Sequence, residues 1–137
     1  MAVGFKSTYL CNKMLDLVYS ATGWTPPATL YCALFTTIPS PGGTGGVEPS
    51  GSGYARIAVT NNATNFPAAS SATKSNATII DFGTPTGSGW GVIVGAGWYD
   101  ASTAGNLISA GPFSVTKTAV AGSDFQIPVS GFQATET

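Results

Sequence analysis

Large and small side chains alternate regularly between Gly89 and Phe113. Trp90, Val92, Val94 and Trp98 lie on one face of this pattern, and Gly91, Ile93, Gly95 and Gly97 lie on the other. A period of two is typical of β-strands, and glycine between large residues indicates close backbone approach. Turn-forming residues fill Asp100–Gly105, and Asn106–Phe113 is the expected second strand, ending at Gly111-Pro112. We therefore predict a hairpin over residues 89–113 at the centre of a small antiparallel β domain.

The segment from Ser7 to Ser20 has the spacing of an amphipathic helix instead. Its apolar side chains fall on one helical face: Leu10, Met14, Leu17 and Val18. Ser7 is a suitable N-cap, and Gly23 stands just past the end, where a left-handed residue is common. We predict an N-terminal helix within residues 7–23. Its apolar face is expected to pack on the sheet, with contact to a neighbouring subunit as the alternative.

Short strands separated by polar loops are predicted for the rest of the chain. The expected strands are Thr29–Thr36, Tyr54–Thr60, Ala77–Phe82, Ser114–Val120 and Asp124–Val129, the last two forming a closing pair. Residues 37–53 and 61–76 are long loops, and the first is expected to be flexible or held by a partner. The polar tail, 130–137, is expected to be loose. This pattern favours one domain over residues 1–137, a two-sheet antiparallel sandwich of jelly-roll type with one short helix.

The composition limits the partners that this chain can have. Only 8% of the residues are charged, where about 25% is usual. The five basic residues are scattered and the net charge is −1, which argues against nucleic-acid and membrane binding. Interface cores are depleted in charge, so this surface suits a protein that packs against neighbours. The N-terminus lacks the apolar core of a signal peptide, and synthesis in a cytoplasm is expected.

The sequence offers little for catalysis. It contains no histidine, which excludes Ser–His and Cys–His nucleophile arrangements. Two cysteines without histidine cannot form a closed zinc site. Cys11 and Cys32 are expected to be free thiols, with a disulfide between them as the alternative. We expect no cofactor, no metal and no enzymatic activity.

Candidate interface residues come mainly from the two loops and the strand between them. They are Ile38, Pro39, Val47, Tyr54, Arg56 and Phe66. Arg56 is the only arginine and would serve as an interface anchor; we favour the alternative, in which it holds a loop by pairing with Asp81 or Asp100. The tryptophans and tyrosines would suit a sugar-binding face, but their period in the strands favours the core.

Several segments, in this order, resemble a family of small tailed-phage virion proteins. They read LYCALFTT, GSGYARIAVT and GSGWGVIVGAGWYDASTAGNLISAGPF, and Gly53–Arg56 and the Trp98–Leu107 run are their most specific parts. Members are known as head decoration or cement proteins and as tail-fibre or structural proteins. The resemblance implies a capsid cement protein on the virion surface, bridging major capsid protein subunits as a dimer or trimer. The alternative is a tail-associated fibre or adhesin component that binds host-surface glycans.

Overall fold

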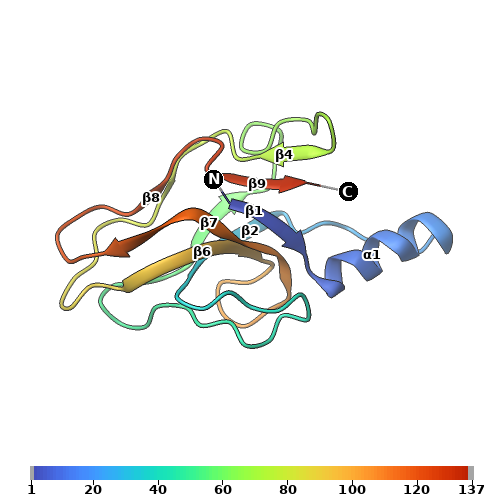
Figure 1. Ribbon diagram of the computed structural model, residues 1–137. Helices are drawn as coiled ribbons and strands as arrows, with labels where there is room; N and C mark the ends of the chain where they lie inside the picture. Colours follow the sequence, from blue (N-terminus) through green and yellow to red (C-terminus); the bar gives the residue numbers. More distant parts are fainter. Residues whose placement is uncertain (1, 136–137) are drawn as a thin grey trace.

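A computed structural model describes residues 2–135, and it is mainly β (Figure 1). One helix, α1 (Thr8–Tyr19), follows the first strand. The described strands are β1 (Ala2–Lys6), β2 (Thr29–Phe35), β3 (Ile57–Thr60), β4 (Thr73–Ser75), β5 (Ile80–Asp81), β6 (Gly91–Tyr99), β7 (Leu107–Ala119), β8 (Gln126–Ile127) and β9 (Phe132–Thr135). The predicted fold class, mainly β with one short helix, is confirmed.

Seven of these strands form one curled sheet, in the order β3-β2-β6-β7-β1-β9-β4. Its pairs are antiparallel except for β1 and β9, which run parallel. The remaining two strands, β5 and β8, form a small antiparallel sheet. A jelly-roll sandwich is not confirmed, because the strands are shared unequally between one large curled sheet and one small pair.

The predicted hairpin is the centre of the large sheet. β6 and β7 pair in the register Gly97↔Ala110 and Trp98↔Ser109. A side chain at position 97 would put its Cβ 2.7 Å from the Ser109 carbonyl oxygen and 2.8 Å from the Phe35 ring, so glycine is needed there. Our prediction that the second strand stops near Pro112 is wrong: β7 continues to Ala119. A register irregularity between Ile93 and Gly95, opposite Pro112, accommodates the missing N–H donor of proline.

Apolar side chains are buried on both faces of the sheet. The larger cluster contains Cys32, Leu34, Ile93, Trp98 and Phe132, together with Ile80 and Ile127 from the small sheet. The smaller cluster contains Ala33, Phe35, Tyr99, Leu107 and Ala110. Alternate residues of β2 enter different clusters, so this strand is central in the sheet and covered on both sides.

Five expectations about local structure are wrong. The strand that was expected to begin at Tyr54 begins at Ile57, and the one expected over residues 77–82 is reduced to β5. β8 pairs with β5, so residues 114–120 and 124–129 do not form a closing pair. The tail expected to be loose contains β9, and the loop 61–76 contains β4. These strands are two to four residues long, too short to show a hydrophobic period.

Residues 37–53 are held by their own chain. Val47 donates its N–H to the Thr37 carbonyl at 2.9 Å, and Thr36 donates to the Val47 carbonyl at 2.8 Å. A turn closes the far part of the loop, where Ser40 donates its N–H to the Thr44 carbonyl at 2.8 Å. Pro39, within this loop, is buried. The expectation that this segment is flexible, or requires a partner to be ordered, is therefore wrong.

The helix begins and ends close to its predicted limits. Ser7 is the N-cap, and its Oγ accepts a hydrogen bond from the Leu10 N–H at 3.1 Å. Ser20 is the C-cap, and the left-handed residue that follows is Ala21, with φ 50°, instead of the predicted Gly23. Figure 1 shows α1 projecting away from the sheet.

Candidate interaction surfaces

Arg56 connects the long loop to the turn of the central hairpin. Its Nε and Nη2 donate to both carboxylate oxygens of Glu48, with the shortest distance 2.7 Å. Its Nη1 donates to the Ala101 and Ala104 carbonyl oxygens at 2.9 and 2.8 Å. The guanidinium also stacks on the Tyr99 ring, 3.6 Å from the centroid. We name these residues, with Tyr54, the Arg56 clamp.

The loop-holding role predicted for Arg56 is therefore confirmed, but the predicted partners are wrong. Glu48, from the loop itself, takes the place of Asp81 or Asp100. Asp100 instead closes the hairpin turn, where its carboxylate accepts from the backbone N–H of Asn106 at 2.6 Å and from the side-chain amide at 2.8 Å. The clamp brings together the two segments that carry the family resemblance, and it does so as a structural contact.

Burial governs the titration of the clamp. Tyr54 accepts a hydrogen bond from the Leu34 N–H at 3.0 Å and donates to Glu48 at 2.8 Å. Burial, with the adjacent Glu48 carboxylate, raises the pKa of Tyr54 far above its ordinary value. For Arg56, burial lowers the pKa, but hydrogen bonds to Glu48 and its charge outweigh that effect and raise it. Both side chains therefore keep their protons through the neutral pH range.

Most of the candidate interface residues are not free to meet a partner. Pro39 and Phe66 are buried, and the Arg56 side chain is 8% exposed. Ile38 and Tyr54 are half-buried, and Val47 is exposed. Phe66 packs edge-on against Trp98, with the ring centroids 5.2 Å apart, so it belongs to the core. The structure separates these six residues among core, clamp and loop, and it does not gather them into one surface.

The largest aromatic side chains lie inside the domain. Trp90 and Trp98 are 5% and 3% exposed. Trp90 donates its indole N–H to the Ser52 carbonyl at 2.9 Å and lies edge-on to Tyr54 at 5.6 Å. The prediction that the strand aromatics form the core is confirmed for these tryptophans, and they do not offer a flat surface to a sugar ring.

The apolar face of α1 is exposed along most of the helix. Met14, Leu15, Leu17, Val18 and Tyr19 are between 37% and 83% exposed. The predicted packing of this face on the sheet is wrong, because α1 projects beyond the strands and only its first turn, with Leu10 half-buried, reaches the body of the domain. The hydrophobic period predicted the helix correctly, but a periodic face does not say what covers it.

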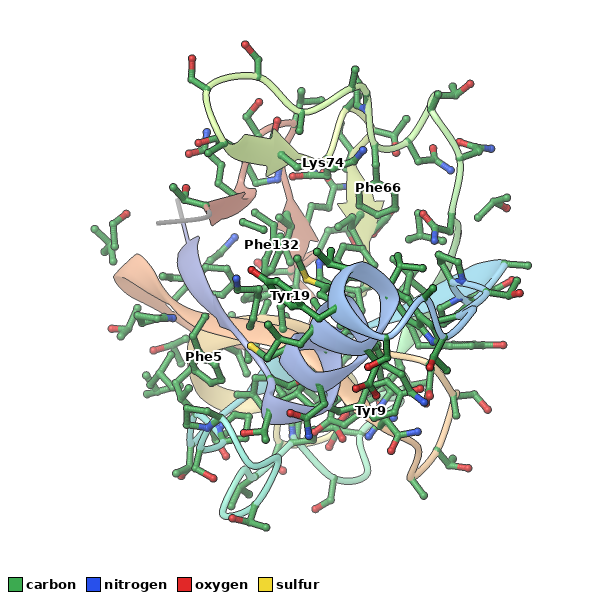
Figure 2. The ribbon with its side chains drawn as sticks, turned by 90° about the vertical axis from the view of Figure 1, so that its right-hand side faces the viewer. Phe5, Tyr9, Tyr19, Phe66, Lys74 and Phe132 are labelled. Atoms are coloured by element: carbon green, nitrogen blue, oxygen red, sulfur yellow. The ribbon has the colours of Figure 1, made fainter. Side chains whose placement is uncertain are left out.

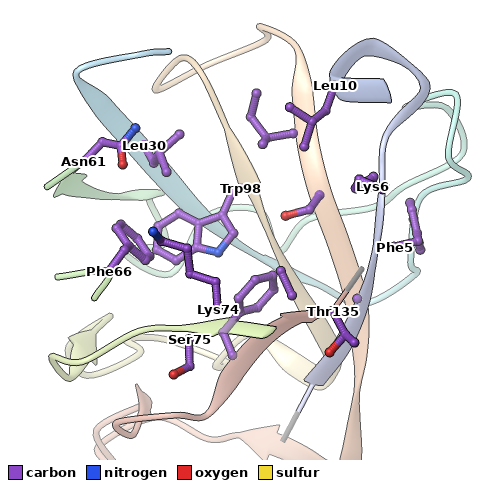
Figure 3. A pocket seen from close by; sticks show the side chains of 15 residues that line it. Phe5, Lys6, Leu10, Leu30, Asn61, Phe66, Lys74, Ser75, Trp98 and Thr135 are labelled. Atoms are coloured by element: carbon purple, nitrogen blue, oxygen red, sulfur yellow. The ribbon is translucent and has the colours of Figure 1, made fainter. Parts of the chain in front are cut away.

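A small apolar cavity lies at the base of α1, inside the curl of the sheet (Figure 3). Its volume is about 190 Å³. Residues far apart in the sequence surround it, among them Leu10, Leu30, Phe66, Trp98, Ile108 and Phe132, and it has Lys6, Asn61 and Lys74 at its edge. In Figure 3 the Lys74 side chain extends toward Phe66 and Trp98. No single segment of the sequence predicts this cavity, because it depends on the nonlocal pairing of β1, β9 and β4.

Neither metal chemistry nor a membrane span is evident in the described residues. Within residues 2–135, no group of three or more His, Cys, Asp or Glu side chains could hold a metal ion. No helix in this part of the chain is long and apolar enough to cross a membrane. Cys11 and Cys32 are free, as predicted, and burial raises the pKa of the Cys32 thiol well above its ordinary value.

Comparison with known protein families connects these features to a virion. The model of the family described as Podophage GP4 fiber I protein gp80 matches residues 6–135. No curated protein matches the chain. The match spans the helix, the Arg56 clamp and the central hairpin, and it confirms the resemblance to phage virion structural proteins. The chain belongs to the Podophage GP4 fiber I protein gp80 family.

Proposed function

We propose that this protein is a non-catalytic structural subunit of a podophage fibre and works through contacts with other virion proteins. The match of residues 6–135 to the fibre I family carries the proposal. The composition supports it, since charged residues make up only 8% of the chain and interface cores are depleted in charge. The Arg56 clamp also supports a structural role, because its polar groups bind one another and the backbone.

Direct binding of host glycans is the less favoured form of a fibre function. Flat aromatic surfaces are usual in sugar sites, but Trp90 and Trp98 are buried and Trp24 is half-buried. We expect tryptophan emission to remain unchanged when host-surface oligosaccharides are added to the purified protein. A saturable change specific to one sugar would support the adhesin function instead.

Capsid decoration is a second candidate, and exposed apolar side chains outside α1 would supply its contact surface. Val92, Val115, Val120 and Val129 are 50–78% exposed and provide apolar surface outside α1. In this alternative the protein would bind the major capsid protein and bridge its subunits on the outside of the head.

Antibody labelling of intact virions separates the two candidates. Gold-labelled antibody against this protein should mark the fibres at the tail, and antibody that has been pre-absorbed with purified protein should not bind. Labelling distributed over the whole head would overturn the fibre assignment and favour capsid decoration.

A further inference from the structure

The cavity at the base of α1 results from a row of small residues in the large sheet. Lys74 of β4 lies opposite Ala134 of β9, and Ala134 lies opposite Gly4 of β1. Residues directly opposite one another share a face of the sheet, and all three line the cavity. One face of three neighbouring strands therefore carries a long side chain beside two positions that leave space.

Aromatic rings form a large part of the cavity wall. Trp98 lies edge-on to Phe66 and to Phe132, with the ring centroids 5.2 and 5.7 Å apart, and all three rings line the cavity. Aromatic rings prefer this edge-to-face arrangement. A further ring inside the cavity would extend the same arrangement, so the wall favours an aromatic occupant.

The size of the cavity restricts its occupant to about one ring. Its volume is about 190 Å³, and an apolar cavity of about 150 Å³ binds one benzene molecule and otherwise stays dry. Sites for drug-sized molecules usually enclose about 300–1,000 Å³. The cavity therefore fits a single six-membered ring with one small substituent, and it is too small for an oligosaccharide or a whole lipid chain.

The charged groups at the edge of the cavity are cations. Lys6 and Lys74 line it, and within residues 2–135 no Asp or Glu does. Asn61 donates one amide N–H to the Pro27 carbonyl at 2.9 Å, and a primary amide has a second N–H to offer. The other polar residues of the wall carry hydroxyl groups: Ser75, Ser109 and Thr135. This set of charges and donors favours a substituent with a negative charge.

Lys74 is the cation available to such a substituent. Lys6 already has another interaction, whereas the Lys74 ammonium group has no ion-pair partner among the described residues. Figure 2 shows Lys74 and Phe66 on the same side of α1, and in Figure 3 the Lys74 side chain extends toward the rings of Phe66 and Trp98. Its alkyl chain can therefore cover the ring of a ligand while the ammonium group stays at the edge, in contact with water.

We propose that this cavity binds a small aromatic acid, with the ring among Phe66, Trp98 and Phe132 and the carboxylate at the ammonium group of Lys74. The apolar wall supplies most of the binding free energy, because it removes the ring from water. The ion pair at the edge is partly hydrated, so it adds selectivity for an acid more than it adds affinity. This binding site does not depend on where the protein is located in the virion.

NMR titration of the full 137-residue chain tests the site with three probes that share one ring and differ in charge. They are benzoate, benzyl alcohol and benzylammonium, at pH 7. The indole N–H signal of Trp98 reports on the cavity, and that of Trp90, which does not line it, is the internal control. We expect benzoate to shift the Trp98 signal saturably, with a Kd of about 0.1–1 mM. Benzyl alcohol should bind about two- to fivefold more weakly, and benzylammonium more weakly still.

Two substitutions separate the role of the cavity from that of the charge. Ala134→Phe places a ring in the cavity from its wall and should abolish binding of all three probes. Ala58→Phe makes the same change at an exposed residue of β3 that does not line the cavity, and it should leave binding unchanged. Lys74→Met keeps an apolar chain and removes the charge, so benzoate should bind about two- to fivefold more weakly and benzyl alcohol as before. Lys117→Met, at an exposed lysine outside the cavity, is the control.

Each result decides the proposal, and thermal unfolding checks that each variant is folded. A saturable shift of Trp98 that Ala134→Phe abolishes, and that Lys74→Met weakens for benzoate alone, supports it. The absence of a Trp98 shift with 10 mM of any probe overturns it, as does binding that persists in folded Ala134→Phe. If Ala134→Phe does not fold, a probe that shifts Trp90 as strongly as Trp98 overturns the location of the site. Benzyl alcohol or benzylammonium binding as tightly as benzoate overturns the assignment of an acid.

Discussion

Replacing Arg56 by alanine should lower the free energy of unfolding more than replacing any exposed charged side chain by alanine. The guanidinium has four hydrogen-bond acceptors within reach, two on Glu48 and two on the hairpin turn, and it stacks on Tyr99. Removing one partner of a buried ion pair costs about 3–5 kcal/mol. Because the Glu48 side chain is 24% exposed and water can partly solvate it, we expect a loss at the lower end, about 3 kcal/mol.

Thermal and chemical unfolding measure this loss. For a domain of this size, 1 kcal/mol corresponds to about 4 °C in Tm, so Arg56→Ala should lower Tm by about 12 °C. Arg56→Lys keeps the charge but cannot form the bidentate hydrogen bonds of the guanidinium, so the free energy of unfolding should fall by about 2 kcal/mol. Lys117→Ala is the control: Lys117 is an exposed cation near an aromatic ring, and its removal should change stability by no more than about 0.5 kcal/mol.

The loss should also be local. The Val47 N–H, which is bonded to the Thr37 carbonyl, lies next to the clamp residue Glu48 and should exchange with solvent faster in Arg56→Ala. Amides in the centre of β6 should change only in proportion to global stability. A Tm within 3 °C of the wild type, or unchanged exchange at Val47, would refute the role assigned to the clamp.

Two further predictions follow from buried groups and close contacts. Burial raises the pKa of Tyr54 and Cys32, so above about pH 9 the unfolded chain loses protons that the folded chain retains. The free energy of unfolding should therefore fall with pH, by up to about 1.4 kcal/mol per pH unit for each group. Cys32→Ala should remove the contribution of the cysteine, and a stability that stays constant up to pH 11 would contradict this prediction. Gly97→Ala should cost about 1–3 kcal/mol, because its Cβ would lie 2.7 Å from the Ser109 oxygen. Gly23→Ala, with nothing within 4 Å, is the control, and equal effects in denaturant unfolding would contradict the packing argument.

Local patterns predicted the elements that depend on local physics. The alternation in residues 89–113 identified the central hairpin, and the apolar spacing with Ser7 identified α1. These signals are strong because each spans several periods. Pro112 lacks the backbone N–H that a strand pair needs, which predicts that the second strand ends there. The strand continues instead, because a register irregularity in β6 accommodates the proline.

The interaction surfaces could not be predicted in the same way. The pairing of β1 with β9 joins residues about 130 positions apart, and the cavity exists only because of it. The sequence predicts that Arg56 holds a loop, but only the folded structure shows that its partner is Glu48 and not Asp81 or Asp100. Phe66 lies in a polar stretch and was assigned to an interface, whereas its ring packs on Trp98. In each case a nonlocal contact decides the outcome.

The number of copies in each virion tests the fibre assignment most directly. Quantitative mass spectrometry of purified particles, with the major capsid protein as the internal reference, measures it. A fibre subunit should be present in a few to a few dozen copies per virion. Hundreds of copies, in a simple ratio to the shell subunit, would contradict the fibre assignment and make capsid decoration the function of this chain.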